Sequence, residues 1–479
     1  MIPKKIPLIK QEIINYFHNT SDFVAFEFET NSNIKMMVCY IEGFIDRDLL
    51  DRDVLKPLIL DLNNKKEINR VIFSSKVKEI DCLEKMIEEI LLGRVAIFVE
   101  NLPSSYTIEL SKWEKRSVEE PNSESVVRGP KEGFIEDIFV NKSLLRRKLR
   151  TNNLVFEDYT LGTQSRTKVS ITYLHGIVNK KVLEEVRKRL KKIDIDAVLE
   201  SGYIEQLIED NTNSIISTIE NSEKPDVVAA KILEGRVAIL CDGTPHVLTV
   251  PRLFVEGIMT SEDYYLRNYY GSFLRFLRVV ALIISVFSPG IYVALQLYHQ
   301  EMIPTVLLIT MMGAREGVPL PVAIETFLMV LTLELTKESG IRLPKSIGTT
   351  VSIVGTLVLG QAAVQAGIVS APTVIVIAIT AISEFVVPAL VQGMILYRIF
   401  ILFLGSFLGL YGTTCGLAIY LVQIISLESF GIPFGSPIAP MDKEGLKDSV
   451  IRFPIQSFVY RPKSIEKRNI KRQKPPRKD

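Results

Sequence analysis

One boundary in this chain limits its fold more than any other feature. Up to about Gly271 the sequence is dense in Lys, Arg, Asp and Glu, whereas residues 279–425 are mostly uninterrupted apolar sequence. Residues 279–298 carry no charge, and they match the roughly 20 residues that a helix needs to cross a hydrocarbon core of about 30 Å. The sequence therefore predicts a soluble first half and a membrane-embedded second half.

The apolar half divides into segments of unequal length. Residues 302–312 are too short to span a membrane unaided, so this piece is expected to be re-entrant or interfacial. The polar loop 337–345 has a net positive charge, which is typical of a cytosolic loop. Longer helices are expected at residues 279–298, 320–335, 347–369, 372–391 and 399–425.

The number of membrane crossings is limited by the two ends of the chain. The charged first half lacks the pattern of a signal sequence and residues 461–479 are strongly basic, so both ends are expected in the cytosol. The number of crossings must then be even, with four or six favoured, although five long helices are expected. Either residues 302–312 also cross, or residues 399–425, which contain several glycines, form a broken hairpin.

An internal repeat organises the soluble half. Residues 92–98 (LGRVAIF) match residues 234–240 (EGRVAIL), and residues 40–45 (YIEGFI) parallel residues 173–178 (YLHGIV). Chance similarity of strand-forming residues is the alternative, but two matched sites in the same order favour a duplication. The expected fold class is an α/β cytosolic region of two related lobes followed by an α-helical multi-pass membrane domain.

These patterns predict where the parts of the chain begin and end. The segment just before the membrane half is aromatic and basic, which suits an interfacial position, and any movement of the lobes would enter the bilayer there. The expected parts are an N-terminal basic segment (1–21), a first α/β lobe (22–110), a linker and connecting helix (111–160), a second α/β lobe (161–262), an interfacial segment (263–278), a polytopic membrane domain (279–440) and a basic cytosolic tail (441–479).

Enzyme signatures are missing from the soluble half. It has no GxxxxGK[ST] phosphate loop, no HExxH or GxSxG motif and no metal-like Cys/His cluster, so no enzymatic activity, catalytic residue, metal or cofactor is expected. The four cysteines are scattered and are interpreted as packing residues. A basic run at Arg146, Arg147, Lys148 and Arg150 could contact nucleic acid or lipid, but a solvated helix face is the better interpretation and no nucleic-acid partner is expected.

A stripe of small and weakly polar residues runs along the expected helix 347–369. Close packing between membrane helices is one interpretation, since small residues let helices approach each other. The alternative is a helix that lines a water-filled path, and periodicity alone slightly favours packing. The stripe comprises Thr349, Ser352, Thr356, Gly360, Ala363 and Gly367, and Gln361 and Gln365 flank it.

Acidic residues inside the apolar half form the second candidate site. Glu384 lies in the middle of residues 373–391, where a carboxylate costs several kcal/mol unless it is paired, protonated or facing water. Glu325 and Glu334 lie on opposite sides of one expected helix, so they are expected to serve different surfaces. A functional role is expected for Glu384, is evenly balanced for Glu325 and is not expected for Glu334, which can reach the membrane surface.

Several separated motifs resemble the A subunits of bacterial spore germinant receptors, and the resemblance covers about residues 22–462. The segments that carry it occur in the family's order. They are residues 234–239 (EGRVAI), 254–265 (FVEGIMTSEDYY), 315–319 (REGVP) with Glu325, 360–367 (GQAAVQAG), 437–440 (PIAP) and 452–454 (RFP).

The resemblance implies a multi-pass protein of the spore inner membrane with its lobes and tail on the cytosolic side. Its implied partners are a B subunit similar to amino-acid transporters and a lipoprotein C subunit, and it implies signal transduction in spore germination. The A subunits of the family are thought to form a homo-oligomer that is a ligand-gated ion channel. With this background, the small-residue stripe is expected to line a cation pore, with Glu384 or Glu325 favouring cations.

Other roles remain open at this stage. A scaffold or transporter-like subunit would couple germinant binding by its partners to ion release without forming the pore itself, and broken helices with intramembrane carboxylates occur in transporters too. A cleft between two related lobes could also bind a small ligand. The germinant, the ion and the subunit number are not encoded in any motif.

Overall fold

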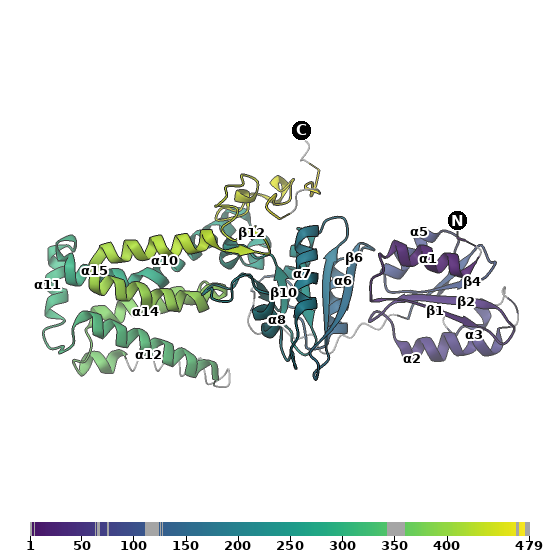
Figure 1. The fold of residues 1–479 in the computed structure, drawn as a ribbon, viewed down its shortest axis with the longest axis horizontal. Coiled ribbons are helices and arrows are strands. Elements are labelled where there is room, and N and C mark those ends of the chain that lie inside the picture. The colour runs from purple at the N-terminus through teal and green to yellow at the C-terminus, as the bar shows by residue number, and fades with distance from the viewer. Residues whose placement is uncertain are drawn as a thin grey trace.

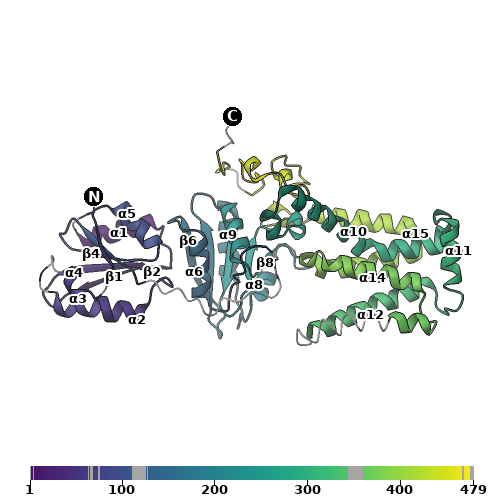
Figure 2. The ribbon, with the colours of Figure 1, turned by 180° about the vertical axis from the view of Figure 1, so that it is seen from behind.

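The computed structural model describes residues 2, 3, 5–62, 64, 68–73, 76–110, 124, 126, 128–342, 360–465 and 469–474. The molecule is elongated, with one α/β lobe at the N-terminal end, a second lobe in the middle and a group of long helices at the other end (Figure 1). The view from behind shows the same order and places the described part of the C-terminal segment, residues 441–465 and 469–474, beside the junction of the second lobe and the helices (Figure 2).

The first lobe is a five-stranded antiparallel sheet with helices on both faces. Its strand order is β1-β2-β4-β5-β3. In β2, Met36 and Val38 face one core, and Met37 and Cys39 face the other, as the two-residue period of a strand requires. The strands are β1 (Phe23–Glu29), β2 (Lys35–Ile41), β3 (Val77–Ile80), β4 (Val95–Val99) and β5 (Ser105–Ile108), and the helices are α1 (Ile6–Tyr16), α2 (Arg47–Leu50), α3 (Lys56–Asp61), α4 (Ile68–Val71) and α5 (Leu83–Leu91).

The second lobe repeats this topology. Its strand order, β6-β7-β9-β10-β8, is the order of the first sheet, which agrees with the repeat seen in the sequence. Gly93 and the matching Gly235 both have a positive φ (+88° and +100°) at the turn that follows a helix, where glycine is favoured. The strands are β6 (Leu154–Leu161), β7 (Thr167–Leu174), β8 (Glu220–Ser222), β9 (Val237–Cys241) and β10 (Val247–Val250), and the helices are α6 (Ile138–Lys148), α7 (Lys180–Lys192), α8 (Ser201–Ile208) and α9 (Pro225–Leu233).

The second lobe starts earlier than the sequence predicts. β6 begins at Leu154 and α6 packs on the second sheet, so much of the expected linker and connecting helix 111–160 belongs to this lobe. The prediction that the basic run lies on a solvated helix face is also wrong for Arg146, because this side chain is fully buried. Its guanidinium donates to Asp22 Oδ1 of the first lobe at 2.7 Å and to the Thr151 carbonyl at 2.9 Å, so α6 ties the two lobes together.

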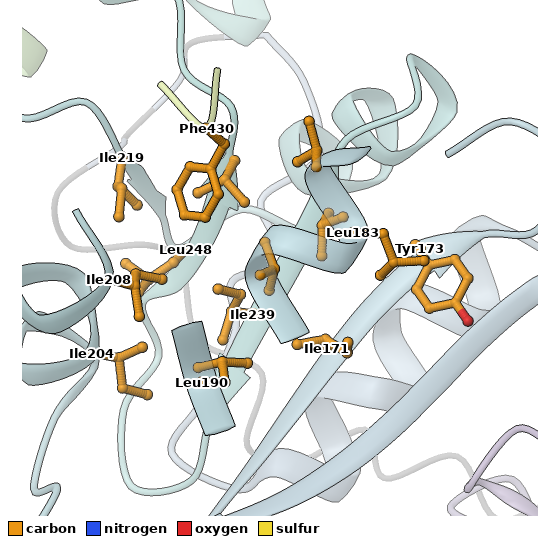
Figure 3. Close-up of a cluster of buried hydrophobic side chains, with 14 of the residues drawn as sticks. Ile171, Tyr173, Leu183, Leu190, Ile204, Ile208, Ile219, Ile239, Leu248 and Phe430 are labelled. Atoms are coloured by element: carbon orange, nitrogen blue, oxygen red, sulfur yellow. The ribbon is translucent and has the colours of Figure 1, made fainter. Parts of the chain in front are cut away.

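The core of the second lobe includes side chains from beyond the apolar half. A short hairpin, β11 (Glu428–Ser429) and β12 (Ile432–Pro433), follows the last long helix. It places Phe430 beside Ile219 and Leu248 in the core cluster drawn in Figure 3. Ile465 of the expected basic tail is fully buried in the same cluster, so this segment is part of the lobe and not a free tail.

The apolar half consists mainly of helices that run along the molecule. Among the described residues, two helical segments are long and apolar enough to cross a membrane, Asn268–Tyr298 and Gly393–Ser426. α10 begins before residue 279, so it absorbs most of the expected interfacial segment, and α12 continues through most of the expected loop 337–345. The short α11 has no buried side chains. The bounds are α10 (Asn268–Tyr298), α11 (Thr305–Gly313), α12 (Val322–Arg342), α14 (Ala371–Phe385) and α15 (Val391–Ser426).

α15 folds back on itself at Gly409, as one of the two sequence-based alternatives requires. Gly409 has φ +61° and ψ −145°, which is not a helical conformation. The rings of Tyr397 and Tyr420 lie 4.7 Å apart, whereas in an uninterrupted helix these residues would be about 35 Å apart. Residues 391–408 and 410–426 therefore form two antiparallel helical arms, each about 26 Å long.

Candidate functional site

A ring of four charged side chains lies between the long helices. Arg398 of α15 donates to Glu334 Oε1 of α12 at 2.8 Å and to Glu384 Oε2 of α14 at 2.7 Å. Lys337 of α12 closes the ring, with its Nζ 2.7 Å from both Glu384 Oε1 and Glu334 Oε2. Arg398 is fully buried and the Glu384 side chain is 3% exposed.

The same arginine also joins α10 to the ring. Pro289 lies inside α10 and has no amide hydrogen, so the carbonyl of Ser285 four residues earlier lacks its helical partner. Arg398 Nε donates to that carbonyl oxygen at 2.7 Å. One guanidinium therefore fastens four helical segments through directed hydrogen bonds, a geometry that its planar fork of donors suits.

The ring is electrically balanced, which changes the role expected for Glu384. Two carboxylates face two cations, so the charges compensate one another where neither could be buried alone. Glu384 is thus engaged in ion pairs inside a single chain rather than presented as a free acid to a passing cation. Glu334, expected to reach the membrane surface, is instead a full member of the ring.

Glu325 belongs to a second buried cluster at the opposite end of α12. It is fully buried, and its Oε1 accepts hydrogen bonds from the Ser370 amide (2.5 Å) and hydroxyl (2.7 Å) at the start of α14. Ser370, Thr373 and Tyr292 continue the chain of hydroxyl contacts at 3.0 Å each. Among the described residues, Glu325 Oε2 has no hydrogen-bond partner, and Arg315 Nε lies 4.0 Å away.

Half of the small-residue stripe can be placed. Thr349, Ser352 and Thr356 lie outside the described residues, as does most of the expected helix 347–369. Gly360 is buried, and a Cβ added there would lie 3.2 Å from Val374 of α14. Ala363 is half-buried, and the flanking Gln361 and Gln365 are exposed.

Gly367 departs from the expected helix. The helix that contains Gly360 ends at Gln365, and Gly367 has φ +66° in the turn that follows. A Cβ at Gly367 would lie 3.4 Å from the carbonyl oxygen of Gly317. At Gly360 and Gly367, therefore, the small residues permit close contacts within the chain, whereas the exposed glutamine side chains lie on its surface.

The boundary between lobe and helices is a buried ion cluster. Asp263 is fully buried and accepts from Arg275 Nε at 3.0 Å and from Arg278 Nη1 at 2.8 Å. Arg275 also donates to Asp448 at 2.8 Å, which ties α10 to the C-terminal segment. Arg275 and Arg278 of the expected interfacial segment thus face protein, while Arg267 is exposed and Tyr269 is 85% exposed.

Two further contacts connect the lobe to the helices. Arg252, which follows β10, donates to the Ala389 carbonyl between α14 and α15 at 3.0 Å. Phe430, next to the end of α15, is 5% exposed in the second lobe, and the Arg189 guanidinium lies 4.3 Å from its ring centroid. A displacement of α15 would therefore reach the lobe core directly as well as through the boundary at α10.

Glu384 was predicted from the sequence as a candidate site residue, but its ion-pair partners Lys337 and Arg398 were not. The sequence predicts Lys337 in a loop and Arg398 just before a helix. In the structure, α12 ends later than expected and contains Lys337, and α15 begins earlier than expected and contains Arg398. The available signal was the rule that a carboxylate in an apolar segment needs a cation. Arg398, fourteen residues after Glu384 with no other basic residue between them, was the nearest candidate.

Comparison with known proteins gives a consistent result over most of the chain. The profile of a family described as Bacillus/Clostridium GerA spore germination protein matches residues 11–464. Spore germination protein KA of Bacillus subtilis is 39% identical over 98% of this chain and 88% of that protein. Spore germination protein GerLA of Bacillus cereus is 41% identical over 90% of this chain and 89% of that protein.

A solved structure is also similar to part of this chain. It is the crystal structure of the N-terminal domain of the A subunit of the Bacillus megaterium spore germinant receptor GerK3. The identity is 34%, with 53% of this chain and 97% of that chain covered and a TM-score of 0.41.

Proposed function

The chain belongs to the Bacillus/Clostridium GerA spore germination protein family, so it has a role in germination, and from this premise we propose that it is the A subunit of a nutrient germinant receptor. In this proposal it is a multi-pass protein of the spore inner membrane that acts with a B subunit and a lipoprotein C subunit. Copies of the chain assemble into a ligand-gated cation channel, and the role is not enzymatic.

The order of the helices supports a six-crossing topology for this proposal. Glu325, near the start of α12, contacts Ser370 at the start of α14, and Lys337, near the end of α12, contacts Glu384 near the end of α14. The two helices are therefore parallel. α10, α12, α14 and the two arms of α15 supply five crossings. Arg342 ends α12 and Gly360 lies near the start of α14. The helix that the sequence predicts at residues 347–369 is the sixth crossing of this proposal. An even number keeps the lobes and the C-terminal segment on one side.

The charge ring is the observation that carries the proposed gating role. It joins four helical segments through one buried arginine, and such a set of ion pairs favours one arrangement of the helices over others. Because Phe430 connects the end of α15 to the second lobe, a signal received by the lobes or by a partner subunit can bias this arrangement. The exposed Gln361 and Gln365 then lie on a surface suited to a cation path between copies.

Germinant-triggered potassium efflux tests the channel proposal. The chain and both partners are reconstituted in potassium-loaded vesicles, and efflux is recorded after the germinant is added. We expect Ala363→Phe to reduce triggered efflux at least fivefold, because it narrows the path beside Gln361 and Gln365. Ile382→Phe is the matched control, since Ile382 is a 66% exposed apolar side chain on α14, and it should leave efflux unchanged.

The same experiment distinguishes the channel from a scaffold or transporter-like subunit. In a channel formed by this chain, Ala363→Phe reduces the efflux while assembly with the partners stays intact. In a scaffold, Ala363→Phe and Ile382→Phe behave alike, and efflux then follows substitutions in the partner that moves the ion.

A further inference from the structure

A cavity of about 560 Å³ lies where the second lobe meets two other segments, residues 253–265 before α10 and the C-terminal segment after residue 436. Its lining includes α9 residues from Asp226 to Lys231, the following Glu234, and Phe458 and Arg472 of the C-terminal segment. Its volume falls within the range of about 300–1,000 Å³ typical of small-molecule sites. Neither the charge ring nor the small-residue stripe contributes to it.

Most charged groups on its wall are already matched. Lys231 pairs with Glu220 and with Glu256, and Arg236 pairs with Glu256 and Glu234. Burial lowers the pKa of Lys231 to about 8 even beside these carboxylates. These ion pairs form the polar part of the wall and leave no free cation among them to hold an anionic ligand.

Asp226 is the exception. Its side chain is only 10% exposed, and Oδ2 accepts a hydrogen bond from the Tyr265 hydroxyl at 2.5 Å. Its other oxygen, Oδ1, is buried and has no hydrogen-bond partner among the described residues, and Lys224 Nζ lies 3.9 Å from Oδ2 while donating to Ser261. A buried carboxylate oxygen without a donor is costly, and it is the group that a cationic ligand would satisfy.

The internal repeat shows that this wall differs from its counterpart in the first lobe. The offset of 142 residues between Gly93 and Gly235 pairs α5 with α9. Exposed Lys85 and Glu88 of α5 are thereby replaced by Val227 and Ala230, both of which line the cavity. The first lobe thus keeps this helix face charged and exposed, whereas the second lobe combines an apolar face with a carboxylate that has one oxygen, Asp226 Oδ1, without a hydrogen-bond partner among the described residues.

We propose that this cavity binds a small molecule with a primary ammonium group and an apolar body. The ammonium donates to Asp226 Oδ1 in a charge-assisted hydrogen bond, and the apolar body packs against Val227, Ala230 and Phe458. The site borders Tyr265, three residues before α10 begins, so an occupied cavity would contact the segment that leads into the long helices.

Equilibrium dialysis of the full-length protein in lipid nanodiscs tests the site, with benzylamine as the probe and protein-free nanodiscs as the reference. Wild-type protein should bind benzylamine saturably and bind benzyl alcohol, which lacks the charge, at least tenfold more weakly. Asp226→Asn and the cavity-filling Ala230→Phe should each weaken benzylamine binding at least tenfold. Glu84→Gln, the matching but exposed position on α5, should leave it unchanged.

Benzylamine binding that does not saturate, or that is equally tight in wild type and in folded Asp226→Asn and Ala230→Phe variants, would overturn the proposal. The two variants act by charge and by volume, so one remains informative if the other does not fold. The measurement needs no partner subunit and no ion flux, so its failure would leave the proposed function standing.

Discussion

Arg398 Nε donates a hydrogen bond to the carbonyl oxygen of Ser285 at 2.7 Å, at the point where Pro289 deprives that carbonyl of its helical partner. The same guanidinium pairs with Glu334 and Glu384. Proline in one helix and arginine in another are thus parts of one structural feature, although 109 residues separate Pro289 from Arg398 in the sequence.

Arg398→Met should destabilise the helices severely. It leaves buried Glu384 and half-buried Glu334 with Lys337 alone and removes the hydrogen-bond donor of the Ser285 carbonyl. Breaking a buried ion pair typically costs about 3–5 kcal/mol. Thermal and denaturant unfolding of the purified protein in detergent measures the loss. Arg398→Lys should recover only part of it, since an ammonium cannot reproduce the planar fork. Exposed Arg150→Met serves as the control, and an equal effect of both methionine variants would contradict the prediction.

Gly409→Ala should weaken the fold-back of α15. The φ of +61° with ψ −145° is a region open essentially to glycine alone, where another residue costs of order 1–3 kcal/mol. The added Cβ would also lie 3.1 Å from Tyr298. Gly313→Ala is the matched control, because a Cβ there meets nothing within 4 Å and alanine favours the helix. The prediction fails if unfolding midpoints of the two variants shift alike.

Phe430→Ala should destabilise the second lobe by about 3–5 kcal/mol, because it removes a nearly buried ring from a packed core. Phe73→Ala, at a 73% exposed ring of the first lobe, should stay within about 0.5 kcal/mol of wild type. Hydrogen exchange locates the change: amides of β9 and β10 should lose protection in Phe430→Ala, whereas those of β4 and β5 should not. Unchanged exchange in β9 and β10 would show that the hairpin only rests on the lobe.

The soluble half could be predicted from the sequence further than the apolar half. Repeated motifs around Gly43 and Gly176 mark equivalent strand ends. Such motifs can be recognised in the sequence because they depend only on residues that are neighbours along the chain. The charge ring could not be assembled in the same way, because Glu334, Glu384 and Arg398 meet only through the packing of separate helices. The fold-back at Gly409 was one of two alternatives, since a glycine can sit within a membrane helix or break it. Phe430 follows a long apolar helix, and nothing local indicates that it packs in a lobe whose core lies some two hundred residues earlier.

The contact between the two lobes should loosen in mild acid. The rings of His18 in the first lobe and His175 in the second are stacked with centroids 3.9 Å apart, and His18 Nε2 lies 3.2 Å from Asn153 Oδ1. The pKa of His175 lies below its ordinary value, because its partial burial and the nearby His18 and Lys180 disfavour the charged form. Because the pKa of His175 is lower while the lobes are in contact, the separated lobes bind more protons at a given pH than the lobes in contact do. The stabilisation is therefore present above about pH 6.5, the pKa of a free histidine, and is lost as the pH falls through the lower folded value.

Hydrogen exchange at the interlobe backbone contact measures this loosening. The Ser21 amide donates to the Phe156 carbonyl at 3.0 Å, so its protection reports whether the lobes are in contact. After correction for the intrinsic exchange rate, its protection should fall between pH 7.5 and pH 5.5, while β9 amides in the lobe core stay constant. His18→Phe retains a stacked ring without a second proton and should reduce the pH response. Equal protection of the Ser21 amide at both pH values would contradict the prediction, because the Arg146 to Asp22 ion pair alone would then determine the contact between the lobes.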